Sequence, residues 1–337
     1  MNIAAVIPCY NGANFIADAI EAILAQSEPA SEVIVVDDCS QDDSRDIVAN
    51  YSDRVILLST EQNSGVQVAR NIGIRHARAD WIALCDHDDI WMPRYLANLS
   101  RLLCGEPGIE FVFCNFQRLQ DKTLETVTKF DQAPQGYWEL AGRRVIPEGW
   151  VFDRNFAGQT FLWHPIFPSA ISFSKRLVAE RGEFNPAMRG FRPEDGEFVL
   201  RCLYRAKVAA IPEPLVAIRR HEANSTGDDL LTLLDEIRLL RWIRENHPEA
   251  RQYSDIIDRE IRRRRITAVN GAFASRRHDL MRELLADIPR QDRSTSMRIK
   301  ASIAWLPDRP GLFLNGMLQG TSGYARLAWR MMGAGRN

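Results

Sequence analysis

The stretch at residues 81–89 reads WIALCDHDD, an apolar run that stops at three carboxylates and one histidine. The apolar part predicts a strand buried on both faces, as strands of parallel sheets are. Carboxylates held close together are unfavourable unless a cation or a proton lies between them. A bare Asp-x-Asp is often only a solvated acidic turn. Because this one directly ends an apolar strand, it predicts that Asp86 and Asp88 bind a divalent cation such as Mg²⁺ or Mn²⁺.

The residues around this stretch alternate between strand and helix patterns. Strands are predicted at 3–7, 33–36, 55–58, 81–85 and 109–116, and helices at 13–26, 42–50, 65–78 and 93–103. This alternation predicts an α/β fold with a mostly parallel sheet and helices on both faces. Ligands of such sheets bind beyond the carboxyl ends of the strands. We therefore expect the polar residues that follow three strands to converge, namely Tyr10-Asn11, Asp37-Asp38 and Asp86-His87-Asp88.

The remainder of the chain divides into three parts. The strand and helix pattern loosens through 117–165, and a segment of that length without regular structure is usually functional. It resumes with a strand at 170–173, a helix at 195–205 and short strands near 207–218. From about residue 228 onward only helical periodicity is found. The predicted domains are an α/β domain at 1–225 and a helical extension at 226–337.

Composition and charge narrow the class of protein. The chain has 337 residues, with 43 Lys and Arg against 44 Asp and Glu, so nothing indicates a general nucleic-acid binder. Residues 237–337 carry a net charge of +10 and the preceding residues −11. The six cysteines have no C-x-x-C spacing, which favours reduced thiols in a cytoplasmic protein. The N-terminus does not resemble a signal peptide, and no apolar run is long enough to span a membrane.

Two residues are candidates for nucleotide binding: Asp38 at a strand end, and Arg70 on the helix predicted at 65–78. The carboxylate of Asp38 could accept a hydrogen bond from a pyrimidine N3–H or a ribose hydroxyl. The alternative is that Asp38 and Ser40 cap the following helix. Arg70 could pair with a phosphate or a base edge, or it could be an ordinary surface arginine.

Two further candidates lie later in the chain. Glu194 and Asp195 precede an amphipathic helix, where one could act as a general base or both could merely complement the helix dipole. His221 could bind a metal or a diphosphate, although a lone histidine near a strand end is more often a surface residue.

Several aromatic and basic residues each allow two explanations. Trp163, His164 and Phe191 could line an acceptor pocket, because aromatic faces stack on sugars, and core packing explains them equally well. The arginines at 262–265 lie on a predicted helix and therefore point around it. A solvated helix is the default explanation for them, and contact with an anionic surface is the second.

Six motifs, taken together, resemble a family 2 glycosyltransferase of the GT-A fold. They are residues 6–11 (VIPCYN), 35–44 (VVDDCSQDDS), 63–74 (NSGVQVARNIGI), 81–89 (WIALCDHDD), 192–198 (RPEDGEF) and 219–221 (RRH). They occur in the family's order and spacing. The resemblance covers about residues 1–225, and nothing beyond that point is recognised.

The resemblance implies a role for each matching residue. Those implied to bind the nucleotide sugar are Pro8, Tyr10, Asn11, Asp38, Arg70, Asp86 and Asp88. Those implied to bind Mn²⁺ or Mg²⁺ are Asp88, Asp86 and His221. Asp195 would be the catalytic base of an inverting transfer, supported by Glu194. The acceptor would meet the region of Trp163, His164 and Phe191.

The function implied is a metal-dependent inverting transfer from a nucleoside diphosphate sugar, with UDP as the expected nucleotide. The acceptor would be a hydroxyl of a saccharide or of a lipid-linked glycan, in the synthesis of a surface polysaccharide or glycoconjugate. Two alternatives stay open: a nucleotidyltransferase, and a non-catalytic sugar-binding protein on a degenerate GT-A fold. The basic extension, with stretches such as Leu327-Ala328-Trp329, favours either peripheral contact with an anionic membrane at its cytoplasmic face or a packing or oligomer extension.

Overall fold

The computed structural model describes residues 1–152, 156–221 and 229–304 in two compact units. The first unit comprises residues 1–227 and 245–256, and the second comprises residues 228–244 and 257–337. The predicted boundary near 225 and the stretch Leu327-Ala328-Trp329 lie outside the described residues. The chain thus returns to the first unit over residues 245–256, a contribution that the sequence pattern did not reveal.

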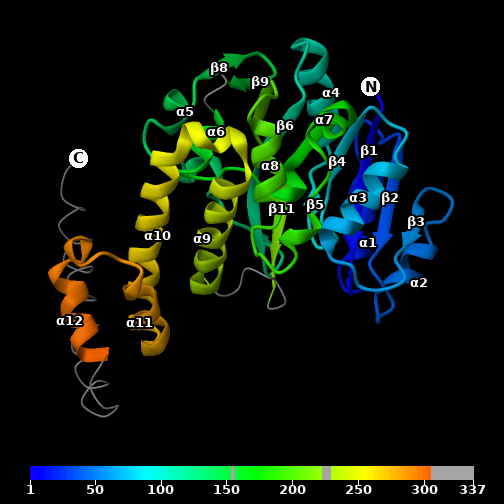
Figure 1. The fold of residues 1–337 in the computed structure, drawn as a ribbon. Coiled ribbons are helices and arrows are strands. Elements are labelled where there is room, and N and C mark those ends of the chain that lie inside the picture. Colours follow the sequence, from blue (N-terminus) through cyan, green and yellow to red (C-terminus); the bar gives the residue numbers. More distant parts are fainter. Residues whose placement is uncertain (153–155, 222–228, 305–337) are drawn as a thin grey trace. The chain divides into compact units, whose positions relative to one another are not determined.

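The first half of the sheet is parallel, as the alternating pattern predicts (Figure 1). Its strands follow the order β3-β2-β1-β4. They are β1 (Ile3–Cys9), β2 (Glu32–Asp37), β3 (Ile56–Ser59) and β4 (Trp81–Leu84). The helices between and after them are α1 (Ile16–Leu24), α2 (Ser44–Ala49), α3 (Val66–His76) and α4 (Tyr95–Gly105). The four strands and the four helices predicted for this half of the sheet are present, with ends that differ by a few residues.

The second half of the sheet is mixed. Its order is β10-β6-β11-β9-β8, with β10 antiparallel to both β4 and β6, and β6 parallel to β11. The strands are β5 (Ile90–Trp91), β6 (Phe111–Gln120), β7 (Thr123–Leu124), β8 (Arg143–Ile146), β9 (Gly149–Phe152), β10 (Ile171–Ser174) and β11 (Val208–Arg220). The helices are α5 (Tyr137–Leu140), α6 (Phe156–Thr160), α7 (Lys175–Arg181) and α8 (Gly196–Leu203). Short 3₁₀ turns lie at Phe130–Gln132, Pro168–Ala170, Pro186–Met188, Pro248–Tyr253 and Arg290–Asp292.

Strand β1 runs two residues further than predicted, through Pro8 to Cys9. A proline has no N–H to donate and is tolerated only where a neighbouring strand is missing on that side. Strand β4 pairs with β1 only as far as Val6, whereas β2 remains paired at Pro8. The end of β1 therefore projects beyond β4, and this opening becomes one wall of the site described below.

The segment at 117–165 contains a packed aromatic cluster rather than a long open loop. Its rings contact one another and Phe113 of β6 at centroid distances between 4.3 and 6.0 Å, for example Phe152 with Phe156 and Phe113 with Phe130. Trp138 and Trp150 are 5.0 Å apart in the same cluster. Neighbouring aromatic rings of this kind stabilise a core beyond the area that they bury. The expectation that this segment is irregular is therefore wrong for most of its length.

The second unit is helical, as predicted. Its helices are α9 (Asp229–Asn246, which ends in the first unit), α10 (Ser254–Ala274, which begins there), α11 (His278–Ala286) and α12 (Thr295–Ala304). Val269, Phe273, Met281 and Leu285 form its core. The predicted divergence of the arginines along α10 is observed: Arg264 reaches Glu260 and Glu236, whereas Arg265 reaches Asp287. No helix within residues 1–152, 156–221 and 229–304 is long and apolar enough to cross a membrane.

Candidate functional site

A cavity of about 860 Å³ opens at the carboxyl ends of β1 and β4. Its walls come from the turns after these strands, the start of α3, the loop before α8 and the end of β11. The predicted site residues that line it are Pro8, Tyr10, Asn11, Arg70, Asp86, Asp88, Phe191, Glu194 and His221. The polar residues that follow β1 and β4 converge at this cavity, as expected. The third group, Asp37-Asp38 at the end of β2, lies behind the cavity wall.

Arg70 holds two acidic residues of the cavity together. Its guanidinium donates to Glu194 Oε1 at 2.9 Å and to Asp86 Oδ1 at 2.8 Å. The arginine side chain is 1% exposed, whereas the two carboxylates are 16% and 20% exposed. A buried guanidinium needs this compensation, and the neighbouring carboxylates raise the pKa of Arg70 further above its usual value. The surface-arginine alternative is thereby excluded, and Arg70 fixes the two acids relative to each other.

The acidic pair before α8 is poised to exchange protons near neutral pH. Burial raises the pKa of Glu194 to about 7 and that of Asp195 to about 6, although Arg70 opposes both shifts. Asp195 is 8% exposed and, unlike Glu194, does not line the cavity. Its side chain does not cap α8. No capping hydrogen bond therefore supports the alternative that the pair merely complements the dipole of α8. The raised pKa values suit a general base.

The end of β11 brings His221 to the acidic turn. His221 Nε2 lies 2.9 Å from Asp88 Oδ2, and its ring stacks on Phe15 at 4.6 Å. Arg219 also donates to the backbone carbonyl of Asp88 at 2.9 Å. His221 is thus not an isolated surface residue, and a carboxylate and an imidazole face the cavity side by side.

Asp89 is a structural residue that the sequence alone did not single out. Its carboxylate accepts a hydrogen bond from the Ser169 hydroxyl and one from the backbone N–H of Arg219 at 2.9 Å. The Ser169 hydroxyl in turn accepts from the backbone N–H of Asp86 at 2.9 Å. Burial and the nearby Asp88 and Asp86 carboxylates raise the pKa of Asp89 well above its usual value. Asp89 therefore holds the acidic turn against β11 and the segment before β10.

The turn after β1 is fixed by the loop after β2. The backbone N–H of Asn11 donates to the Ser40 hydroxyl at 2.9 Å, and Asn11 Oδ1 accepts from the backbone N–H of Gln41 at 2.8 Å. The expectation that Ser40 caps α2 is wrong, because α2 begins at Ser44 and its N-cap residue is Asp43. Next to this turn, a Cβ on Gly12 would lie only 2.4 Å from the ring of His87. Only glycine lets the turn and the acidic loop approach this closely.

Asp38 is buried and supports the loop between β3 and α3. Its oxygens accept hydrogen bonds from the Thr60 hydroxyl at 2.8 Å, the Ser64 N–H at 2.8 Å and the Gly65 N–H at 2.7 Å. Gly65 has a φ of 96°, which favours glycine. Asp38 therefore orients a wall of the cavity without lining it, and the nucleotide contact expected of it stays a prediction.

The three expected acceptor residues do not lie together. Phe191 lines the cavity, whereas Trp163 and His164 do not. Trp163 packs edge-to-face on Tyr137 at 4.9 Å and lies under the Lys129 ammonium at 4.7 Å. His164 Nδ1 lies 3.1 Å from the carbonyl of Ile166. The surroundings of Trp163 are therefore those that the core-packing explanation describes.

Gln67 and Arg189 are among the residues of the cavity wall that sequence reasoning did not single out. Gln67 lies one helical turn before Arg70 on α3, so the i, i+3 spacing from Arg70 could have indicated it. Arg189 donates to Asn63 Oδ1 at 2.8 Å and packs beside Gly65. It joins the loop before α8 to the loop before α3, a contact across 126 positions that no local pattern predicts.

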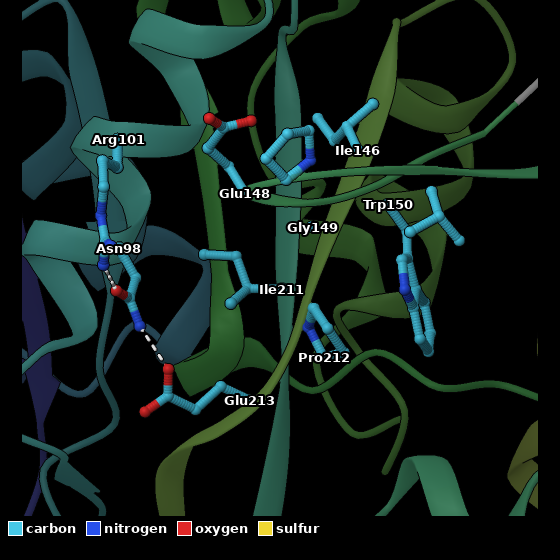
Figure 2. A pocket seen from close by; sticks show the side chains of 11 residues that line it. Asn98, Arg101, Ile146, Glu148, Gly149, Trp150, Ile211, Pro212 and Glu213 are labelled. Atoms are coloured by element: carbon cyan, nitrogen blue, oxygen red, sulfur yellow. Dashed lines mark hydrogen bonds between the residues drawn. The ribbon is translucent and has the colours of Figure 1, made fainter.

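A second cavity of about 280 Å³ lies apart from these residues, between α4, the β8–β9 hairpin and the middle of β11. Figure 2 shows Asn98 bonded on one side to Arg101 and on the other to Glu213, which accepts at 2.7 Å. None of the predicted site residues lines it. It therefore adds nothing to the candidate site.

The donor atoms around Asp88 fit a divalent cation that also binds substrate. The Asp88 carboxylate suits Mn²⁺ or Mg²⁺, the His221 imidazole beside it adds a nitrogen donor, and Asp86 has one oxygen engaged by Arg70. Within residues 1–152, 156–221 and 229–304, no group of three or more His, Cys, Asp or Glu is arranged to enclose a metal. A cation here would complete its coordination with phosphate oxygens and water.

Comparisons with known proteins place the chain in a family. The sequence model of the family described as glycosyl transferase family 2 matches residues 4–157. An uncharacterized glycosyltransferase of Haemophilus influenzae is 31% identical over 245 residues, which are 72% of this chain and 76% of the relative. The putative teichuronic acid biosynthesis glycosyltransferase TuaG of Bacillus subtilis is 34% identical over 137 residues, or 40% of this chain. The match covers 53% of TuaG, so the chain spans about half of that relative's length.

Among solved structures, S. aureus TarS 1–349 in complex with UDP-GlcNAc superposes with a TM-score of 0.57 at 14% identity. The superposition covers 90% of this chain and 79% of that one. At such low identity the likeness concerns the fold, and it confirms the predicted GT-A architecture.

Proposed function

The chain belongs to glycosyl transferase family 2, and from this premise we propose that it transfers a sugar from a nucleoside diphosphate sugar to a hydroxyl acceptor. The observation that carries the proposal is the convergence of Asp86, Asp88, His221 and the Arg70–Glu194 pair in one cavity. UDP is the expected nucleotide, since TarS binds UDP-GlcNAc. The name of TuaG supports a role in the synthesis of a surface polysaccharide or glycoconjugate.

The diphosphate of the donor would lie at the acidic turn. Asp88 and His221, together with Asp86, would hold Mn²⁺ or Mg²⁺ there. When bound, the cation offsets the negative charge that develops on the departing diphosphate. Pro8, Tyr10 and Asn11, at the end of β1, would contact the nucleoside, with Asp38 behind them.

Asp195 would act as the base. Its carboxylate, which does not itself line the cavity, would turn toward the acceptor hydroxyl and take its proton while that oxygen forms a bond to the anomeric carbon. The bond from this carbon to the diphosphate oxygen breaks on the opposite face, and a single displacement of this kind inverts the centre. Glu194, held by Arg70, would orient the reacting groups. Buried surroundings raise the pKa of Asp195 to about 6, which makes it a stronger base than an exposed aspartate.

The acceptor would approach from the loop before α8, where Phe191 lines the cavity. A saccharide or a lipid-linked glycan fits the family's chemistry. Peripheral contact of the basic extension with an anionic membrane, at the cytoplasmic face, belongs to the same proposal. Flotation of the full chain with liposomes that contain or lack anionic lipid tests this contact, and no lipid-dependent binding would remove it.

The direct test of the reaction class is the product released from the donor. Wild-type protein with UDP-glucose or UDP-GlcNAc and Mn²⁺ should release UDP, the sugar passing to water when no acceptor is supplied. A nucleotidyltransferase would instead release pyrophosphate from a nucleoside triphosphate, and a non-catalytic sugar-binding protein would release neither. Asp88→Ala should lose Mn²⁺-dependent UDP binding in calorimetry, and an unchanged affinity would contradict the assignment of Asp88.

A further inference from the structure

The segment at 245–256, which returns to the first unit and is called the return segment below, brings a buried histidine to helix α8. His247 Nε2 lies 3.0 Å from Glu197 Oε1, and its Nδ1 lies 3.4 Å from the hydroxyl of Tyr204. The side chains of His247 and Glu197 are 5% and 2% exposed. Because buried polar groups are unfavourable unless they are paired, these contacts hold the two side chains together.

Glu197 lies in the first turn of α8, two residues after the proposed base Asp195. The helix begins at Gly196, and the backbone N–H of Val199 donates to the carbonyl of Asp195 at 2.9 Å. The Asp195 side chain makes no capping hydrogen bond to the helix. The backbone of this first turn therefore sets where the Asp195 carboxylate lies.

Two side chains hold the Glu197 carboxylate. Arg201, one turn further along α8, donates to it at 2.6 and 2.9 Å, so this pair lies within one helix. His247 binds the same carboxylate from 50 positions away. Although burial opposes ionisation, the hydrogen bonds from His247 and Arg201 lower the pKa of Glu197. His247 therefore ties a charged carboxylate in the first turn of α8 to a part of the chain outside that helix.

The return segment is packed closely enough to serve as an anchor. The Tyr253 ring stacks on Tyr204 at 6.2 Å and lies 5.6 Å from the ring of Phe161. A Cβ on Gly158 of α6 would lie only 2.9 Å from the Tyr253 ring. Ala250, in the middle of the segment, is fully buried. Such dense packing transmits a displacement instead of absorbing it.

Building on the proposed function, we propose that His247 is a positioning residue for the transfer, which holds the first turn of α8 through Glu197 so that Asp195 can reach the acceptor hydroxyl. His247 itself does not line the cavity. A displacement of about 1 Å at a reacting group can lower turnover about a hundredfold. A segment beyond the predicted α/β domain thereby contributes to the reaction by fixing the place of the base.

Two substitutions of His247 test this role. Glutamine can keep a donor near the place of Nε2, whereas leucine cannot bind Glu197. With UDP-glucose or UDP-GlcNAc and Mn²⁺, His247→Leu should lower kcat for UDP release about tenfold or more, while calorimetry shows UDP affinity within about twofold of the wild type. His247→Gln should keep most of the wild-type kcat. A merely structural role would not separate kcat from donor affinity in this way.

Val48→Ala is the stability control, because Val48 lies on α2, is 1% exposed and does not line the cavity. Deleting buried methyl groups destabilises the fold, but kcat measured below the melting transition should equal that of the wild type. Tyr204→Phe is a milder change, which removes the hydroxyl beside Nδ1 of His247. If His247→Leu does not fold, Tyr204→Phe takes its place, and its kcat should fall about threefold with UDP affinity kept.

Four outcomes would overturn the inference. They are a wild-type kcat in His247→Leu, or in Tyr204→Phe where it takes its place; a loss of UDP affinity as large as the loss of kcat; no recovery in His247→Gln; and an equal loss of kcat in Val48→Ala. If the wild type released no UDP at all, the proposed function itself would fail, so the two failures can be told apart.

Discussion

His221 Nε2 lies 2.9 Å from Asp88 Oδ2, although 133 positions separate the two residues in the chain. Strand β11 carries His221 to the turn after β4, because Arg219 binds both the carbonyl of Asp88 and the carboxylate of Asp89. The pair gives the cavity a carboxylate and an imidazole, whose positions are fixed by the turn after β4 and the end of β11.

We predict that His221→Asn weakens Mn²⁺-dependent UDP binding by about tenfold or more. Residues that only orient a metal ligand already contribute about 10- to 100-fold to metal affinity, and a ligand should contribute at least as much. Titration calorimetry with UDP and Mn²⁺ measures the effect. His164→Asn, outside the cavity, is the control and should bind as wild type does. Equal losses in both variants would show that His221 has no special part in metal binding.

Replacing Arg70 should destabilise the fold strongly. Arg70→Met leaves Glu194 and Asp86 without their shared partner, and breaking a buried pair in this way costs about 3 to 5 kcal/mol of the free energy of unfolding. Arg75→Met, which breaks an ion pair with Glu183 in which the arginine is 61% exposed, should cost about 1 kcal/mol or less. Urea unfolding at pH 7 measures both, and similar losses would contradict the account of Arg70.

The pH dependence of turnover follows from the raised pKa of Asp195. As a general base it must be deprotonated, so kcat/KM should fall as the pH drops through about 6 instead of about 4. The contribution of Asp195 to the free energy of unfolding depends on pH in the opposite direction, because its pKa is higher in the folded than in the unfolded state. This contribution is present below about pH 4 and is lost as the pH rises through about 6. A pH–rate profile for the wild type measures the first effect. An acidic limb near pH 4 would argue against this base.

Gly12 should not tolerate a side chain while His87 is present. Gly12→Ala places a Cβ 2.4 Å from the His87 ring, and such overpacking costs about 1 to 3 kcal/mol of stability. Trimming the ring in the double variant Gly12→Ala/His87→Ala should recover only part of that loss, because Cys9 Sγ would still lie 2.9 Å from the added Cβ. Urea unfolding of the two single variants and the double variant measures the coupling. Strictly additive losses would show that the two residues do not interact.

Local patterns predicted the parallel half of the fold well. The β-branched run at Val33–Val36 and the helical spacing at 13–26 are strong local signals, and β2 and α1 lie where they indicate. The mixed half was not predictable in the same way, because the place of β10 between β4 and β6 depends on pairing across long stretches of chain. The β8–β9 hairpin was missed because each of its strands is only four residues long, too short for a clear alternation.

In the candidate site, too, local patterns predicted some residues and missed the long-range contacts. Asp86, Asp88 and Tyr10 follow strands directly, so the rule for carboxyl ends of parallel strands placed them at the cavity. The partner of Arg70 at Glu194 lies 124 positions away, and the burial of Asp38 depends on hydrogen bonds from Thr60 and Ser64. Such contacts form only once the chain is folded, and no spacing in the sequence indicates them.

The most direct test of the proposed glycosyl transfer compares Asp195→Asn with wild type, using UDP-glucose and UDP-GlcNAc with Mn²⁺ and following the UDP released. We expect the wild type to release UDP. We expect Asp195→Asn to bind UDP with nearly wild-type affinity and to release almost none from the sugar nucleotide, because the base is gone while the donor contacts remain. Turnover in Asp195→Asn close to that of the wild type would contradict the proposed mechanism.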